Sequence, residues 1–251
     1  MFYYLLFMNV VYPQNFKDFL KIFAAGRLDF IPDILEAINE SHMLESPKNF
    51  YEHEFSGFFL HSGGTMVLLW VFFVLVYLVS KLAVLFARKK NSVLNQFFRR
   101  SVEQFEWSGM IRMWTSTYLE LLFAGLLQIR VINFSDGFYI LSSVFAIGFT
   151  LANFALPFLS LTLIKKKIKG SSNNLNKYRA LVDDYDTERK SSKYFLFFVL
   201  CRRMFMIISV LFLYYHPKPQ VILPWIFNLC LLVLLVVVKP HNSSLLNFSE
   251  S

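Results

Sequence analysis

The chain has 251 residues, of which 56% are hydrophobic and 18% aromatic, and its mean hydropathy is +0.47. The apolar residues arrive in long uninterrupted runs, which is typical of a chain whose solvent is lipid and excludes an ordinary soluble domain. The formal charge of +8 does not indicate a nucleic-acid partner, because Lys and Arg stand beside apolar runs and form no separate basic patch.

The first apolar stretch, residues 1–12, is too short to cross a membrane. As a helix it would be about 17 Å long, whereas the hydrocarbon core is about 30 Å thick. It lacks the basic flank and cleavage site of a signal peptide. We interpret it as the remnant of a truncated membrane segment, which predicts that this chain is the C-terminal piece of a longer protein.

Residues 13–63 form the one sizeable polar segment. Apolar side chains at i, i+3, i+4 and i+7 over residues 16–23 predict an amphipathic helix that lies on the membrane or caps the bundle. Asn39 stands in the sequence Asn-Glu-Ser, a glycosylation acceptor, which agrees with an extracytoplasmic position.

Five later apolar runs have the length of a span, which is roughly 20 residues. The run at 109–131 is the least hydrophobic, and a proline-rich turn at 216–219 separates the last two. The predicted fold class is all-α: a polytopic transmembrane helical bundle over residues 64–239, with a tail at 240–251. The five predicted spans are residues 64–87, 109–131, 138–164, 194–215 and 220–238.

The loops on the two sides of these spans differ strongly in basic residues. Residues 88–106, 165–193 and 239–251 contain 15 Lys and Arg in total, whereas loops of the same total length on the other side contain 5. The positive-inside rule therefore predicts a cytoplasmic C-terminus. Four lysines open the loop at 165–193 and either flank the membrane as a stop-transfer signal or bind anionic lipid; they are Lys165, Lys166, Lys167 and Lys169.

Polar residues recur at every fourth position of the predicted span 109–131. This spacing places them near one face of the helix, which should point into protein or water. The set comprises Arg112, Ser116, Glu120 and Gln128, with Ala124 between the last two.

Two arginines, Arg202 and Arg203, fall inside the predicted span 194–215. Glu120 lies at a similar depth in its own span, and a charge pair offsets much of the cost of burying each charge. We therefore predict an ion pair between Glu120 and one of these arginines. It acts either as a static clamp, which we favour, or as a gating or transport element.

The predicted span 138–164 contains Pro157, which leaves the carbonyl of Asn153 without its helical donor and predicts a kink. Small residues at Ser142, Ala146 and Thr150 repeat every fourth position and predict close packing of a neighbouring helix.

No motif in the sequence indicates enzyme chemistry. There is no glycine-rich phosphate loop, activated nucleophile or zinc-protease motif, and the cysteines, Cys201 and Cys230, have no metal-ligand spacing. We expect no enzyme activity, cofactor or metal site. The short outer loops at 132–137 and 216–219 also leave no room for a pore helix and selectivity filter.

Several short segments carry a resemblance to a known group of proteins. They are NVVYPQ, FSGFFLHSGG, YLELLFAGLLQI and, most specifically, LCRRMFMIISVLFLYYHPKPQ with the later VVVKPHN. In their order the chain resembles the TRP-like C-terminal transmembrane region of large ciliate membrane proteins and, more loosely, fungal TRP-like and flavin-carrier proteins.

The resemblance implies a multi-pass membrane domain that contributes to ion permeation or its regulation. The alternative is a structural anchor or supernumerary subunit of a larger membrane complex. The expected surroundings are the lipid bilayer and either a homo-oligomer or a larger membrane assembly.

Overall fold

The structure is a computed structural model that describes residues 4, 7–10, 15, 50, 57–86, 93–132, 134, 136–169 and 194–238. These residues form helices and connecting turns and no strand, which confirms the all-α fold class. The elements are α4 (Phe59–Phe86), α5 (Val93–Gln104), the π-helix η4 (Phe105–Gly109), α6 (Met110–Arg130), α7 (Gly137–Lys169), α8 (Phe195–Phe212) and α9 (Pro217–Val238).

Four of these helices, α4, α7, α8 and α9, are long and apolar enough to cross a membrane. They correspond to four of the five predicted spans. The fifth prediction, residues 109–131, falls on α6, whose 21 residues reach about 32 Å. α6 is less apolar than these four helices and is not among them, so its crossing of the membrane stays a prediction.

Several element boundaries differ from the prediction. The first span begins at Phe59, five residues before Gly64, because the N–H of Phe59 finds a hydrogen-bond acceptor inside the bundle. The last helix begins at Pro217, since a helix tolerates proline in its first turn, where backbone N–H groups have no helical acceptor. Residues 93–104, expected to lie in a loop, form α5 with exposed Arg99 and Arg100.

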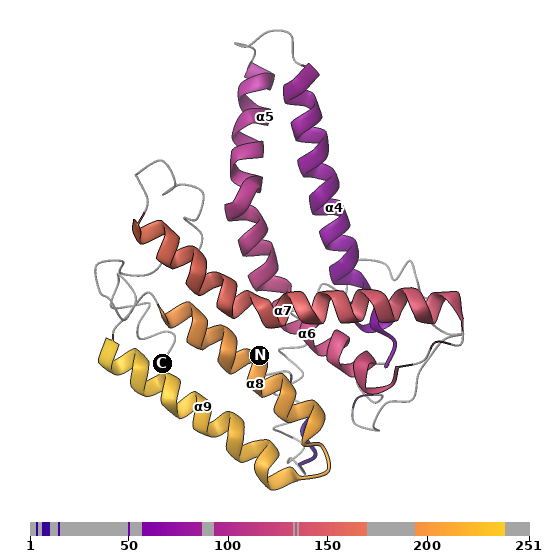
Figure 1. Ribbon diagram of the computed structural model, residues 1–251, viewed down its shortest axis with the longest axis vertical. Helices are drawn as coiled ribbons and strands as arrows, with labels where there is room; N and C mark the ends of the chain where they lie inside the picture. Colours follow the sequence, from indigo (N-terminus) through magenta and orange to yellow (C-terminus); the bar gives the residue numbers. More distant parts are fainter. Residues whose placement is uncertain are drawn as a thin grey trace.

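The helices include two antiparallel pairs, α4 with α5 and α8 with α9, and α6 lies between the pairs (Figure 1). α4 and α5 extend together away from the rest of the bundle, and α8 lies beside α9. α5 continues through η4 into α6, which contacts α4, α7 and α8. α7 changes direction part-way along its length (Figure 1), and the attribution of this bend to Pro157 stays a prediction.

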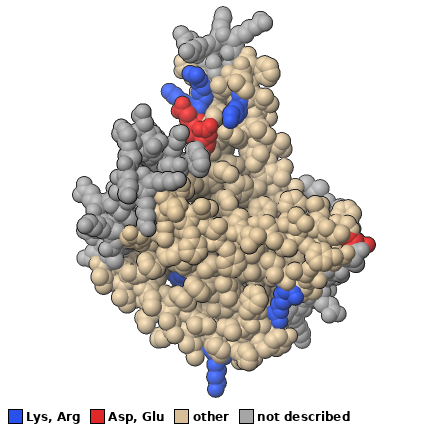
Figure 2. All heavy atoms as spheres, viewed as in Figure 1, with Lys and Arg blue, Asp and Glu red and all other residues tan. Residues whose placement is uncertain are grey.

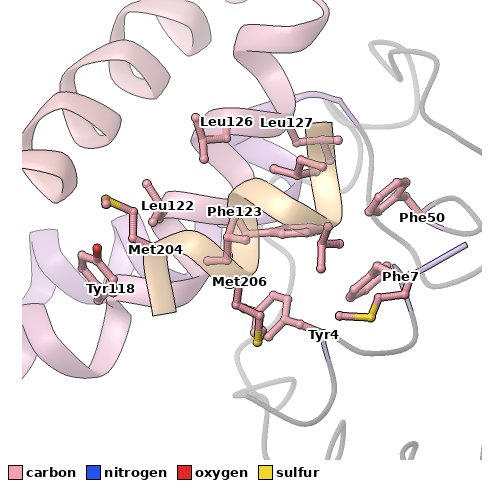
Figure 3. Packing of buried hydrophobic residues seen from close by; sticks show 14 of the residues in the cluster. Tyr4, Phe7, Phe50, Tyr118, Leu122, Phe123, Leu126, Leu127, Met204 and Met206 are labelled. Carbon is pink, nitrogen blue, oxygen red and sulfur yellow. The ribbon is translucent and has the colours of Figure 1, made fainter. Parts of the chain in front are cut away.

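The main core surrounds α6. Its residues from Thr117 to Gln128 are buried except Leu119 and Glu120, and they pack against α8 through Met204, Met206 and neighbouring residues. Three residues of the N-terminal apolar segment also lie in this core: Tyr4, Phe7 and Met8. Figure 3 shows Tyr4 and Phe7 beside Phe123. The rings of Tyr4 and Phe7 each lie 5.2 Å from the ring of Phe123. These three residues of the segment interpreted as a remnant are thus part of the packed core.

The outer faces of the candidate spans are apolar. Only 11% of the most apolar window of α4 is buried, and Phe72, Leu85 and Val237 are among the most exposed large side chains. Figure 2 shows a cluster of Lys, Arg, Asp and Glu near the top of this face and isolated charged residues along its lower and right edges, with few on the broad tan region between. An apolar surface of this extent is compatible with an integral, multi-pass membrane protein.

Several predictions concern residues outside the described part of the chain. These are the amphipathic helix at 16–23, the glycosylation acceptor Asn39, most of the loop at 165–193 and the tail at 240–251. The backbone of α7 extends to Lys169, but the side chains of the lysine cluster at 165–169 are likewise outside the description.

Candidate functional site

A buried hydrogen-bond network joins α4, α6 and α7 at Gln128. The side chain of Gln128 is fully buried, and its Oε1 accepts hydrogen bonds from the backbone N–H of Phe59 and from the Ser142 hydroxyl, both at 2.6 Å. Its Nε2 donates to the Ser143 hydroxyl at 2.9 Å. Every polar atom of the carboxamide is therefore bonded to a neighbouring helix.

The network also supports the first turn of α4. The first N–H groups of a helix have no acceptor within it and need one elsewhere. Gln128 provides this acceptor for Phe59, and the Ser142 hydroxyl accepts from the N–H of Leu60 at 3.4 Å. α6 and α7 thus cap the start of α4, where Phe59 is fully buried.

A tight contact between α6 and α7 lies next to this network. A Cβ atom at Gly125 would collide with the Thr150 hydroxyl and lie 3.1 Å from the carbonyl oxygen of Ala146. Ser142, Ala146 and Thr150 are all buried, which confirms the close packing predicted from the small residues of α7. The partner that permits this approach is Gly125.

Two tryptophans bind the other end of α6 to its neighbours. Trp70 Nε1 donates to the Thr117 hydroxyl at 3.0 Å, and Trp114 Nε1 donates to Asn153 Oδ1 at 2.8 Å. The two indole rings pack edge to face with 5.8 Å between their centroids. Asn153, which the sequence singled out through Pro157, thus accepts a hydrogen bond from α6 with a fully buried side chain.

The predicted polar residues of α6 do not share one face of the helix in the structure. Arg112 and Ser116 are exposed, Glu120 is half-buried and Gln128 is fully buried. The cause is helical geometry: a step of four residues turns the helix by about 400°, so each member is displaced by about 40° from the one before. Over four steps the set winds around the helix, and of these residues only Gln128 reaches the buried network.

The two arginines of α8 lie on the helix that packs against α6. Arg202 and Arg203 are both half-buried, and α6 and α8 are in contact. Arg203 lies near enough to the buried hydroxyl of Tyr118 to act on it electrostatically. The ion pair of Glu120 with one of these arginines stays a prediction.

A second buried glutamine, Gln220 in the first turn of α9, joins the N-terminal segment to α8 and was not predicted as a site residue from the sequence. Gln220 Oε1 accepts from the backbone N–H of Asn9 at 2.8 Å, and Gln220 Nε2 donates to the carbonyl of Val210 at 2.9 Å. Asn9 Nδ2 donates to the carbonyl of Tyr214 at 3.1 Å. The available signal was an amide residue among apolar ones beside a proline-rich turn.

No comparison with protein-family models, curated proteins or solved structures finds a match to this chain. Among the residues that the structure describes, no three His, Cys, Asp or Glu side chains gather as metal ligands would. The geometry of the buried polar residues therefore carries the functional argument.

Proposed function

We propose that this chain is a non-enzymatic integral membrane subunit that helps to hold a larger membrane assembly together. The observation that carries the proposal is the network at Gln128. The buried carboxamide of the predicted polar face is fully used to join three helices. Polar groups that are hydrogen-bonded between helices in this way stabilise a scaffold. At Gln128 they leave no polar atom unbonded that could contact a transported ion or a substrate.

The arrangement of α4 supports the same proposal. α4 and α5 project from the bundle, and the outer face of α4 exposes Phe72 and Leu75. Such a face can contact lipid or apolar helices of a partner. The proposal includes α6 as a fifth span shielded by its neighbours, a cytoplasmic C-terminus, and contact of the lysine cluster at 165–169 with anionic lipid.

Purification from native membranes in a mild detergent tests this function. We expect a tagged chain to co-purify with other membrane proteins, or with further copies of itself, in a fixed stoichiometry measured by native mass spectrometry. The paired substitutions Phe72→Ala and Leu75→Ala should release the partners, because they remove apolar contact area from the outer face of α4.

The matched control removes apolar area from α9 through Val233→Ala and Val236→Ala, at residues that are also exposed. We expect this control to retain the partners, provided that α4 forms the contact. A wild-type chain that always elutes alone would refute the assembly role.

A second candidate function, ion permeation or its regulation in a TRP-like domain, has one observation in its favour. The Nε atom of Arg203 is buried and makes no hydrogen bond within the described part of the chain. An ionised group inside a membrane span costs several kcal/mol unless it has a function or a partner. Purified protein in liposomes should then conduct ions, and Arg203→Gln should change the current.

A further inference from the structure

A hollow on the surface of the bundle lies between α4, α6 and α7. It has a volume of about 360 Å³ and is lined by Trp70, Trp114, Val144, Phe145, Gly148, Phe149 and Ala152. This volume lies at the small end of the range for small-ligand sites. We refer to it as the tryptophan groove.

The lining of the tryptophan groove is apolar because its two indole N–H groups are turned inward. The indole N–H groups of Trp70 and Trp114 donate hydrogen bonds to Thr117 and Asn153, respectively, and the ring carbons of both tryptophans line the groove. A ligand with hydrogen-bonding groups would find no partners among these side chains. The groove therefore suits a hydrocarbon.

The space itself comes from small residues of α7. Gly148 is exposed and lines the groove, and a Cβ atom there would meet no other atom within 4 Å, so a larger side chain would project into the open space. Ala152 lies one turn further along the same side of α7. Along α7, Gly148 and Ala152 each come two residues after a small residue that packs against α6. Those packed residues are Ser142, Ala146 and Thr150.

The position of the groove along α4 and α7 indicates that the acyl chains of membrane lipids surround it. Trp70 is the twelfth residue of α4, and Gly148 is the twelfth residue of α7. At 1.5 Å per residue each lies about 17 Å from the start of a helix that can cross the membrane. Each residue therefore lies near the middle of its own candidate span, and the proposed crossing of the membrane by α4 and α7 places both away from the headgroups.

Tryptophan normally concentrates at the membrane surface, where its N–H group meets water and headgroups. At mid-membrane depth an indole needs an internal acceptor, and both have one. We propose that the tryptophan groove binds one acyl chain of a membrane lipid as a defined site. This inference rests on the part of the proposed function in which α4 and α7 span the membrane.

Quenching of tryptophan fluorescence by lipids with brominated acyl chains tests the proposal. The double variant Trp107→Phe/Trp225→Phe leaves only the two groove tryptophans as emitters. The fluorescence of the Trp107→Phe variant minus that of the double variant is the emission of Trp225. This residue is 63% exposed on α9 and reports contact with bulk lipid. Reconstituted protein is titrated with increasing mole fractions of brominated lipid.

A bound acyl chain should make the groove tryptophans reach half-maximal quenching at a lower mole fraction of brominated lipid than Trp225. A preference of about tenfold corresponds to about 1.4 kcal/mol. Gly148→Leu fills the groove and should abolish this preference. Gly137→Leu is the matched control, because a Cβ atom at Gly137 also meets nothing within 4 Å, and it should leave the quenching unchanged.

Quenching curves that coincide for the groove tryptophans and Trp225, and that Gly148→Leu does not alter, would overturn the proposal and show contact with bulk lipid only. If Gly148→Leu does not fold, Ala152→Leu fills the same groove from the next turn. Failure of the membrane assignment itself gives a different result: Trp225 is then not quenched, and the protein does not float with lipid vesicles.

Discussion

The side-chain oxygen of Gln128, near the end of α6, accepts the backbone N–H of Phe59, the first residue of α4, at 2.6 Å. A residue 69 positions away along the chain thus caps a helix whose start lies inside the bundle. Because the same oxygen also accepts from Ser142, one atom fixes three helices relative to one another.

Replacement of Gln128 should weaken this junction. Gln128→Leu leaves the N–H of Phe59 and two serine hydroxyls without this partner, and we expect a loss of about 1–2 kcal/mol in the free energy of unfolding. Titration with a denaturing detergent, followed by circular dichroism, measures it. Ser116→Ala on the exposed side of α6 is the control and should change stability little; equal losses for both variants would contradict the account.

Gly125 should not tolerate a methyl group. Gly125→Ala places a Cβ atom against Thr150 and the carbonyl of Ala146, so α6 and α7 must separate, at a cost of about 1–3 kcal/mol in unfolding free energy. The same detergent titration checks this prediction. Gly148→Ala is the matched control, since its Cβ atom meets nothing within 4 Å. Helix propensity favours Ala over Gly, so a loss as large for Gly148→Ala would contradict the account and show that the contact with Thr150 is not the cause.

The predicted ion pair calls for a double-mutant cycle. Glu120→Gln combined with Arg202→Gln or with Arg203→Gln should give a coupling energy of at least about 0.5 kcal/mol for one of the two arginines. The pairing is wrong if Glu120→Gln leaves the unfolding free energy unchanged while both arginine variants collapse the protein. In that case the arginines have other partners.

The N-terminal segment should loosen when Gln220 is replaced. Gln220→Leu removes the acceptor of the Asn9 N–H, and hydrogen exchange at that amide should become faster when measured by mass spectrometry. Asn9→Ala should have a smaller effect, because it keeps this backbone bond and loses only the side-chain bond to Tyr214. Equal protection in wild type and Gln220→Leu would show that aromatic packing alone holds the segment.

Much of this fold follows from run length and hydropathy. α4, α7, α8 and α9 were predictable because about 20 consecutive apolar residues have few alternatives to a membrane helix. α5 was assigned to a loop because residues 93–104 are polar on average and lie between two spans, although their amphipathic pattern is typical of a helix.

The candidate site was predictable only in part. The sequence indicated Gln128 and Asn153 as notable residues, but their partners Phe59 and Trp114 are 69 and 39 positions away, and tertiary packing alone defines such pairs. The predicted polar face of α6 was too regular: a spacing of four residues does not match the helical period of 3.6, so Arg112 and Gln128 diverge around the helix. The amide of Gln220 beside a proline-rich turn was a local signal, but nothing in the sequence pairs it with Asn9, which lies 211 positions away.

α6 lies at the centre of the bundle in contact with α4, α7 and α8, and we predict that it crosses the membrane. In a background with Cys201→Ser and Cys230→Ser, single cysteines at Arg99 before α6 and Asp136 after it report the two sides, since both positions are exposed. A membrane-impermeant thiol reagent applied to sealed, oriented vesicles should label the two cysteines from opposite sides. Labelling of both from the same side would contradict the account, because α6 would then not cross the membrane.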